Sequence, residues 1–444
     1  MMEGTIMSGK AKRKRYLNSG LTTVLAFAAL LSACQEGGNS GKSESSSVKP
    51  EELPPANLTI FSTSGWSQEA FDDRFGNLLR KKFPQHTITY QSGKNYDDLI
   101  LTGSKVDIVW ESIAAYSNAR PYNIQYDMTE LIERHQVDLS RIDLTFIDAM
   151  KTMGDGKING LPVLNNTLGL YYNKDLFDQF GVPYPKDHMT WDEVLELNKR
   201  LTIANNGTTY VGLAFLLEHF LRLNSFSLPY VETGTLRASF DKNDRWNILF
   251  DTLTRATSVP LYRDTITSSK KIPDTVSFFK DRNSAMLVGL VNSHLTQDVS
   301  GLNWDIVSFP TFKEAPNVGP QASPTIFGIA ATSDHKDQSM ELIKYLISDE
   351  FQISVSRSGA LPVVNSPEVV SAFGKETAFT DKNLKAAFSS KLAPISAKTI
   401  YDGEVWKVVN KNTMPLVTGT TDLNTMLRST EEEANAIIQS MKIK

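Results

Sequence analysis

The sequence predicts an α/β fold in which helices cover both faces of a parallel sheet. Three short segments rich in β-branched and aromatic residues, 58–61, 87–90 and 106–110, alternate with two segments of helical character, 68–82 and 96–101. Strands that alternate with helices usually pair in parallel, because each helix carries the chain back across the face of the sheet. We therefore expect a layered α/β arrangement where the folded part of the chain begins.

The same alternation continues further along the chain. An apolar segment at 168–172 is expected to form a buried strand, and 340–347 is expected to form a helix. Thr190 and Glu193 have the spacing of a capping box, in which each side chain accepts a hydrogen bond from the other residue's backbone N–H. Trp191 follows the cap and is expected to pack into the core as the first apolar residue of a helix.

The first 33 residues have the features of a secretory signal peptide. Five basic residues between positions 10 and 15 precede an apolar stretch at 21–31, which is too short to span a bilayer as a helix. Residues 31–34, Leu-Ser-Ala-Cys, end this stretch with Cys34, the only cysteine of the chain. This order resembles a bacterial lipobox, in which the cysteine receives a diacylglyceryl group before cleavage. We expect Cys34 to be lipidated rather than buried as an inert thiol.

The segment that follows Cys34 is expected to be a flexible tether, at 34–56. It consists mainly of Gly, Ser, Lys and Glu, so it has little apolar surface to bury. The chain has a formal charge of −4, and removal of a leader with five basic residues and one acidic residue leaves −8. An acidic body of this kind argues against nucleic acid as a partner.

The sequence contains no common catalytic or nucleotide-binding motif. G-x-S-x-G, H-E-x-x-H, a Walker loop and G-x-G-x-x-G are all absent, and the six histidines never fall within one helical turn of each other. The carboxylate pairs at 72–73 and 97–98 fall on expected helices, where a solvated face explains them. We therefore predict no catalytic residue, no metal site and no cofactor, and an enzyme is kept only as an alternative class.

Six short motifs follow one another in a recognisable order along most of the chain. They are Gly-Leu-Pro at 160–162, Leu-Tyr-Tyr-Asn-Lys-Asp-Leu-Phe at 170–177, Thr-Trp-Asp-Glu at 190–193, Phe-Lys-Asp with Ala-Met at 279–286, Phe-Pro-Thr-Phe-Lys at 309–313, and Phe-Gly-Ile-Ala at 327–330 leading to Gly-Ala-Leu-Pro at 359–362. In these motifs the chain resembles the extracellular solute-binding proteins of ABC importers, in the branch that includes maltodextrin-binding proteins.

The resemblance implies a two-lobed periplasmic-binding-protein-like fold of type II, the Venus flytrap arrangement, with hinge strands between the lobes and ligand in the cleft. Lobe 1 is expected at 57–171 and 323–370, and lobe 2 at 172–322 and 371–444. Crossings between the lobes are expected near 170–173, 320–326 and 366–375. Few and extended crossings suit a hinge, because small backbone rotations there swing one lobe against the other.

Several candidate site residues follow from the ends of the first strands. Ser64 and Trp66 come just after the strand at 58–61, at the carboxyl edge where open α/β sheets bind ligands. Trp66 has an equally good interpretation as the first core residue of its helix. Glu111 ends the strand at 106–110 at the same edge, and we favour it over Trp110 because a charged residue there is hard to explain as core.

Other candidates are implied by the resemblance. Asn166 falls where the relatives have an acidic cleft residue, and Glu218 and Phe220 fall in place of a Glu-Pro-Tyr run whose tyrosine stacks on the sugar. A buried position in an apolar helix is the preferred interpretation for Phe220. Trp406 precedes Gly419 by thirteen residues, as a stacking tryptophan does in the relatives, and is the best single candidate.

One departure from the relatives concerns the region after 285–286, which lacks their aromatic cleft element. Asn292 or His294 would offer hydrogen bonds there instead.

The resemblance as a whole implies a monomeric, lipid-anchored protein on the outside of the cell membrane. It would capture a carbohydrate or related small solute and deliver it to ABC permease subunits. A lipoprotein of the same fold that acts as a sensor or adhesion module, without a transporter, is the alternative.

Overall fold

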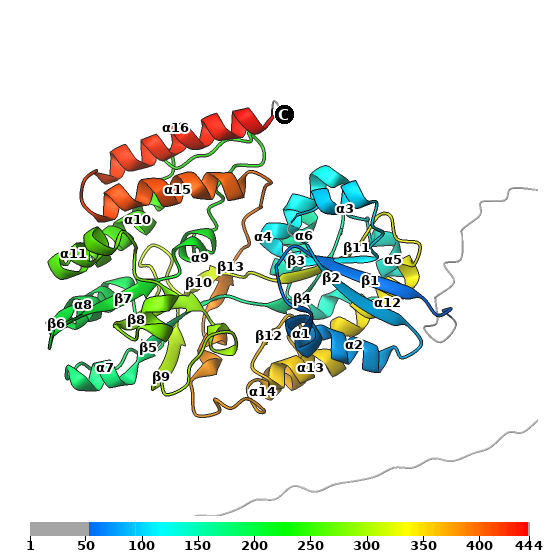
Figure 1. The fold of residues 1–444 in the computed structure, drawn as a ribbon, viewed down its shortest axis with the longest axis horizontal. Helices are drawn as coiled ribbons and strands as arrows, with labels where there is room; N and C mark the ends of the chain where they lie inside the picture. Colours follow the sequence, from blue (N-terminus) through cyan, green and yellow to red (C-terminus); the bar gives the residue numbers. More distant parts are fainter. Residues whose placement is uncertain (1–52, 94, 443–444) are drawn as a thin grey trace, which may run out of the picture. The chain divides into compact units, whose positions relative to one another are not determined.

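The computed structural model describes residues 53–93 and 95–442. The expected leader at 1–33, Cys34 and most of the tether at 34–56 lie outside the described residues. Among the described helices, none combines the length and the apolar character that a membrane crossing requires. Figure 1 shows two main sheets, each flanked by its own helices.

The first sheet has six strands in the order β12-β4-β11-β3-β1-β2, and with its helices we call it lobe 1. Its strands are β1 (Asn57–Ser62), β2 (Thr87–Ser92), β3 (Ile108–Ser112), β4 (Leu161–Asn165), β11 (Thr325–Ile329) and β12 (Leu361–Pro362). The predicted parallel pairing holds for β1, β2 and β3. It fails for β11, which runs antiparallel to β3 and β4 because the chain re-enters this sheet from the second lobe rather than through a crossover helix.

Successive side chains of a strand point to opposite faces of the sheet, and in lobe 1 both faces are buried. Leu58 and Ile60 belong to one apolar core and Phe61 to the other.

The helices that surround this sheet are α1 (Gln68–Phe71), the π-helical turn η2 (Asp72–Gly76), α2 (Asn77–Lys82), α3 (Asp97–Thr102), α4 (Ile113–Tyr116), α5 (Thr129–Arg134), α6 (Leu144–Met153), α12 (Lys336–Leu346), α13 (Asp349–Arg357) and α14 (Pro367–Ala372).

The second sheet has five strands in the order β6-β7-β8-β5-β9, and with its helices we call it lobe 2. Its strands are β5 (Leu168–Asn173), β6 (Ile203–Asn205), β7 (Thr208–Phe215), β8 (Ser284–Leu290) and β9 (Trp304–Ser308). Leu170 faces one core and Tyr171 the other, so this sheet is also covered on both faces. The mixed α/β, two-lobed fold expected from the sequence is confirmed.

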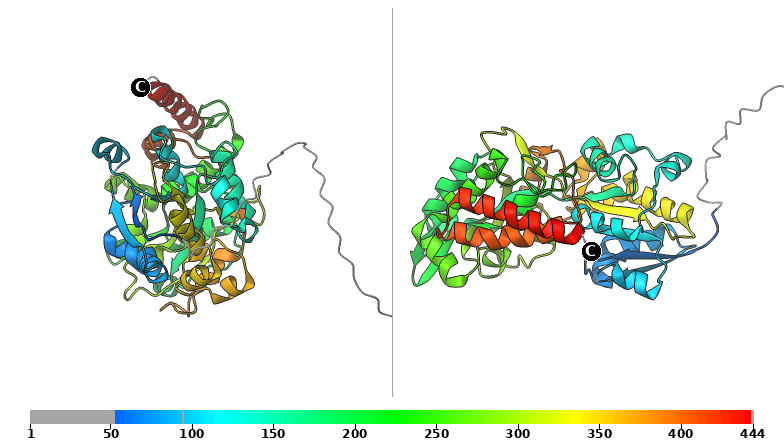
Figure 2. Two further views of the ribbon diagram at one scale, coloured as in Figure 1. Left: turned by 90° about the vertical axis from the view of Figure 1, so that its right-hand side faces the viewer. Right: turned by 90° about the horizontal axis from the view of Figure 1, so that it is seen from above.

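Seven α-helices of the described chain belong to lobe 2. They are α7 (Lys174–Gln179), α8 (Trp191–Leu201), α9 (Leu217–Arg222), α10 (Asp244–Thr257), α11 (Pro260–Ser269), α15 (Asp402–Val417) and α16 (Leu423–Lys442). Figure 2 shows α15 and α16 side by side as a helical hairpin on this lobe.

The predicted start of α8 is confirmed in detail. The backbone N–H of Thr190 donates to Glu193 Oε2 at 2.7 Å, and the N–H of Glu193 donates to Thr190 Oγ1 at 3.3 Å. Trp191 is only 3% exposed and packs against Phe215 and Phe309. The tryptophan is a core residue, as its position after a helix cap indicates.

The chain passes between the two sheets in three places. It leaves β4 and enters β5 through 166–167, four residues before the expected 170–173, because those residues already form the interior of β5. It returns from β10 (Val318–Gln321) to β11 through 322–324. It leaves lobe 1 again after α14, and a short strand, β13 (Lys391–Ala393), pairs with β10 before the chain reaches α15.

A single buried glutamine ties these three passages together. Gln321 is 0% exposed, and its side chain donates to the carbonyl of Asn224 at 2.9 Å and accepts from the backbone N–H of Ser396 at 2.7 Å. Its backbone carbonyl accepts from Thr167 Oγ1 at 3.1 Å, and its N–H donates to the carbonyl of Leu223 at 2.8 Å. The first, second and third passages are therefore fixed at one point.

We predict that Gln321→Ala lowers the free energy of unfolding by about 2–4 kcal/mol. The substitution leaves the backbone groups of Asn224 and Ser396 buried without the partners that they have now. Urea unfolding followed by tryptophan fluorescence measures the change. Gln179→Ala, at the exposed end of α7, is the matched control and should be nearly neutral. Equal losses in the two variants would contradict the role given to Gln321.

Candidate functional site

The topology brings the carboxyl ends of several strands together at one edge of each sheet. In lobe 1, β1, β3 and β4 point in the same direction, because β1 is parallel to β3 and β11 is antiparallel to both β3 and β4. In lobe 2, β7 and β8 are parallel and β5 is antiparallel to β8, so β5 begins where β7 and β8 end. The passage at 166–167 joins these two edges directly, and such edges bind ligands in open α/β sheets.

Glu111 lies at the lobe 1 edge but is only 1% exposed. Its Oε1 accepts hydrogen bonds from the backbone N–H of Thr63 at 2.5 Å and from the Tyr96 hydroxyl at 3.2 Å. Burial raises the pKa of this carboxyl, and the bonds from Thr63 and Tyr96 oppose that shift. Glu111 thus holds the loop that follows β1 in place instead of presenting its carboxylate to solvent.

That loop carries Ser64 and Trp66. Ser64 is exposed, and Trp66 is half-buried, with its ring centroid 5.1 Å from that of Trp110 and 6.4 Å from that of Phe75. The hydroxyl of Tyr90 donates to the carbonyl of Trp66 at 3.2 Å. One side of the indole therefore belongs to the aromatic core of lobe 1, while part of the ring remains accessible at the carboxyl edge.

Two candidates that are far apart in the sequence meet at the lobe 2 edge. Asn166 Nδ2 donates to Asn292 Oδ1 at 2.6 Å, and both residues are half-buried. Asn292 follows β8 and Asn166 precedes β5, which explains why the topology places them together. The backbone carbonyl of Asn166 also accepts from the N–H of Ser323, in the second passage, at 2.8 Å.

Glu218, at the start of α9, belongs to a cluster of charged residues at the end of β7. Its carboxylate pairs with Arg222 one turn later at 2.8 Å, and the guanidinium lies 6.0 Å from the ring centroid of Tyr230. Tyr230 is 3% exposed, and its hydroxyl has no partner within the described chain. An unpartnered buried hydroxyl beside an ion pair is a group that a ligand oxygen could satisfy.

Lys398 and Asp402 extend this charged cluster from the third passage into α15. Lys398 is 5% exposed, and its ammonium donates to Ser396 Oγ at 2.7 Å. Burial lowers the pKa of Lys398 from 10.5 to about 8, with Asp402 opposing the shift and Arg222 adding to it. Burial also raises the pKa of Asp402, which accepts a hydrogen bond from Thr399. No local sequence pattern points to Arg222, Tyr230, Lys398 or Asp402.

The two aromatic candidates of lobe 2 differ in exposure. Phe220 is 0% exposed and packs 5.4 Å from Trp191 and 5.2 Å from Phe215 between ring centroids, so it is a core residue and presents no face for stacking. Trp406 is half-buried on α15, one helical turn after Asp402. Its indole borders the lobe 2 core and retains exposed surface. Trp406 is therefore the aromatic candidate that stays available in lobe 2.

In the described part of the chain, no group of three or more His, Cys, Asp or Glu side chains could hold a metal ion. His294 is 3% exposed and is stacked on Trp304, with ring centroids 5.4 Å apart. Burial lowers the pKa of His294 to about 4, so the imidazole is neutral near pH 7.

The family of the chain follows from a match to a family model. The model for bacterial extracellular solute-binding proteins matches residues 62–353, which is more than half of the chain. The protein belongs to this family.

Solved structures agree with the two-lobed fold. A sugar transporter from Rhizobium etli in an open conformation is 21% identical, with a TM-score of 0.68 over 86% of this chain and 99% of that one. An ABC substrate-binding protein from Listeria monocytogenes in complex with cycloalternan is 19% identical, with a TM-score of 0.67 over 88% and 100%. A cyclic α-maltosyl-1,6-maltose binding protein from Arthrobacter globiformis is 15% identical, with a TM-score of 0.66 over 87% and 100%.

The buried lysine predicts a specific dependence of stability on pH. Because the folded-state pKa of Lys398, about 8, lies below 10.5, the unfolded chain holds a proton between these values that the folded chain has lost. The contribution of Lys398 to the free energy of unfolding should therefore rise with pH in this window, by about 2 kcal/mol from pH 7 to pH 10, and it is read as the difference between wild type and variant because buried tyrosines titrate in the opposite sense. Lys398→Met should remove this increment.

Urea unfolding at the two pH values measures the effect. Lys407→Met, with a side chain that is 69% exposed on α15 nine residues later, is the control and should keep the increment. The prediction fails if wild type and Lys398→Met respond to pH in the same way.

Proposed function

We propose that this protein captures a carbohydrate outside the cell and delivers it to the permease of an ABC transporter. Family membership supports a solute-binding role. Structures of the same fold include proteins in complex with cycloalternan and with mannobiose. The observation that carries the proposal is the meeting of Asn166 and Asn292 where β8 ends, at the edge where the neighbouring strand β7 is followed by the ion pair of Glu218 and Arg222.

The chemistry of these side chains suits a sugar. Amides both donate and accept, so Asn166 and Asn292 can exchange their mutual hydrogen bond for bonds to hydroxyl groups without leaving a polar group unpaired. Glu218 offers an acceptor and Ser64 an exposed hydroxyl. Trp66 and Trp406, both half-buried, would supply flat apolar faces for pyranose rings. In this proposal Glu111 does not contact the ligand. It positions the loop that carries Ser64 and Trp66.

Delivery requires that the loaded protein differ from the empty one. In our proposal a ligand that touches both lobes stabilises a closed arrangement through contacts that one lobe alone does not provide. The three passages, fixed at Gln321, are the short connections that such a motion would bend. The permease would then recognise the surface of the closed form.

The proposal includes a place for the protein in the cell. The order of basic, apolar and small residues before Cys34 supports export and attachment of a lipid to that cysteine, with 34–56 as the tether. A diacylglyceryl group carries two chains, which is the number that stable anchoring needs. We propose a monomer that is held on the outer side of the cell membrane.

The ligand class is tested by isothermal titration calorimetry with a panel of maltotriose, mannobiose and a cyclic α-glucan. At least one saccharide should bind with a dissociation constant below about 100 μM, which corresponds to roughly 5.5 kcal/mol. A panel without any binding, together with thermal stabilisation by an amino acid or a peptide, would contradict the proposal.

Trp406→Ala should weaken binding of the selected saccharide by about 1–3 kcal/mol while unfolding stays cooperative, because the ring supplies contact area that water replaces. Calorimetry measures the affinity, and denaturant unfolding without ligand measures the stability. Lys407→Ala, at the next and exposed position, is the control. A stability loss of about 3–5 kcal/mol with unchanged affinity would instead make Trp406 a core residue.

Cys34→Ala should release the protein from the membrane as an uncleaved or soluble form, because the lipid is the anchor that we propose. Cell fractionation followed by immunoblotting measures the distribution. If the variant remains in the membrane fraction in the wild-type amount and resists a salt wash, the anchor is not at Cys34.

A further inference from the structure

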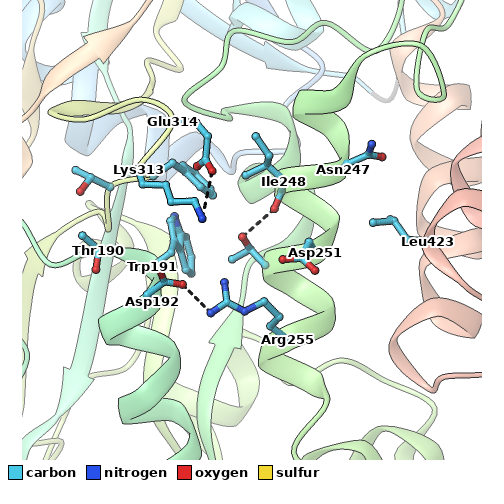
Figure 3. A pocket seen from close by; sticks show the side chains of 13 residues that line it. Thr190, Trp191, Asp192, Asn247, Ile248, Asp251, Arg255, Lys313, Glu314 and Leu423 are labelled. Atoms are coloured by element: carbon cyan, nitrogen blue, oxygen red, sulfur yellow. Dashed lines mark hydrogen bonds and ion pairs between the residues drawn. The ribbon is translucent and has the colours of Figure 1, made fainter.

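Lobe 2 contains a pocket that shares no residue with the candidate site described above. Its volume is about 350 Å³, which is within the range of small-molecule sites, and it lies where the start of α8, the middle of α10 and the loop at 311–314 meet (Figure 3). Leu423, at the beginning of α16, closes one side.

Backbone hydrogen bonds hold one wall of the pocket in place. The backbone N–H of Trp191 donates to the carbonyl of Thr311 at 3.1 Å, and the N–H of Thr311 donates to the carbonyl of Met189 at 2.9 Å. These bonds fix the loop at 311–314 against the capped end of α8. A rigid wall of this kind lowers the entropic cost of binding, because little has to become ordered.

The base of the pocket contains a hydrogen-bond donor without an acceptor. The indole of Trp191 lines the pocket, the residue is 3% exposed, and its Nε1–H has no partner within the described chain. Phe220, Phe309 and Phe312 surround the ring at centroid distances of 5.4–5.5 Å, so it cannot turn to find one. A buried donor without a partner is unfavourable, and an oxygen from a bound molecule would satisfy it once the side chains that cover Nε1 move aside.

The polar walls indicate the chemistry of that molecule. Figure 3 shows the ion pairs Asp192–Arg255 and Lys313–Glu314 on either side of Trp191, at N–O distances of 2.6 Å and 3.7 Å. Asp251 adds a third carboxylate, so acidic residues outnumber basic ones and an anion is disfavoured. Paired charges offer donors and acceptors together, which suits hydroxyl groups.

We propose that this pocket is a second ligand site, which binds one sugar ring as a neutral polyhydroxylated molecule. A ring or hydroxyl oxygen accepts the indole N–H of Trp191, and neighbouring hydroxyl groups contact Asp251 and the two ion pairs. The site goes beyond the proposed cleft function, because its lining residues come entirely from lobe 2 and a ligand there touches a single lobe.

The test uses the intact chain with ¹⁵N-labelled indole groups, read by nuclear magnetic resonance. The chain has six tryptophans, and the Trp191 signal is the one that disappears in Trp191→Phe. Should that variant not fold, contacts between the indole proton and the ring protons of Phe312 assign the signal. On titration with D-glucose or methyl α-D-mannoside, the Trp191 signal should shift with half-saturation in the millimolar range.

A matched pair of variants on α10 locates the effect. Asp251→Ala should raise the half-saturating concentration about five-fold or more, as expected for a lost hydrogen bond. Asp244→Ala, seven residues earlier on the same helix and outside the pocket, should leave it unchanged. Absence of a Trp191 shift with both sugars, or an equal effect of the two variants, would overturn the proposal.

A third variant separates this pocket from the cleft. In Asn292→Ala, the Trp191 signal should shift with the same half-saturating sugar concentration as in wild type. If the shift disappears in this variant, lobe closure moves the signal and the second site is overturned. Absence of saccharide binding in the cleft would contradict the proposed function. The Trp191 titration does not depend on that result, because it reports on the pocket in lobe 2.

Discussion

The hydrogen bonds of buried Gln321, from both its backbone and its side chain, are the constraint on which the arrangement of the three passages depends. Each lobe packs apolar cores on both faces of its sheet, and one core of lobe 2 also includes Leu361 of the lobe 1 strand β12. The lobes are joined by three passages. Gln321 ends β10 at the second, its backbone carbonyl accepts from Thr167 in the first, and its side chain accepts from Ser396 in the third. An amide fits this position because it donates and accepts at once. In our proposal, motion of one lobe against the other leaves these bonds intact and bends the chain beside them.

The position of this constraint also decides where charged side chains gather. Lys398 lies two residues after Ser396, and the carbonyls of Arg222 and Asn224 face the amide of Gln321. The buried ammonium, the carboxyl of Asp402 and the ion pair of Arg222 are thus assembled at the edge where β7 ends. Keeping such groups out of water costs stability, as the lowered pKa of Lys398 indicates. Proteins often retain such groups where a polar ligand has to be recognised.

Much of the fold could be predicted from local patterns, while the site could be predicted only in part. The period of the strands, the capping box at Thr190 and the burial of Trp191 are all properties of neighbouring residues, and the structure agrees with each. Ser64, Trp66 and Glu111 could be placed at one edge of the sheet because strand ends meet there, although Glu111 is buried and supports the loop. Tyr230 and Lys398 carry no local signal, since they come from segments far apart in the sequence, the loop after α9 and the third passage. The antiparallel direction of β11 has the same origin, because it depends on where the chain returns.

Small-angle X-ray scattering with and without saturating saccharide tests the central claim most directly, that a ligand shared by the two lobes closes them about the passages fixed at Gln321. Calorimetry on the same sample establishes saturation. The account predicts a smaller radius of gyration in the bound state, because closure brings the two lobes nearer to each other. A radius of gyration that does not change at full saturation would contradict it.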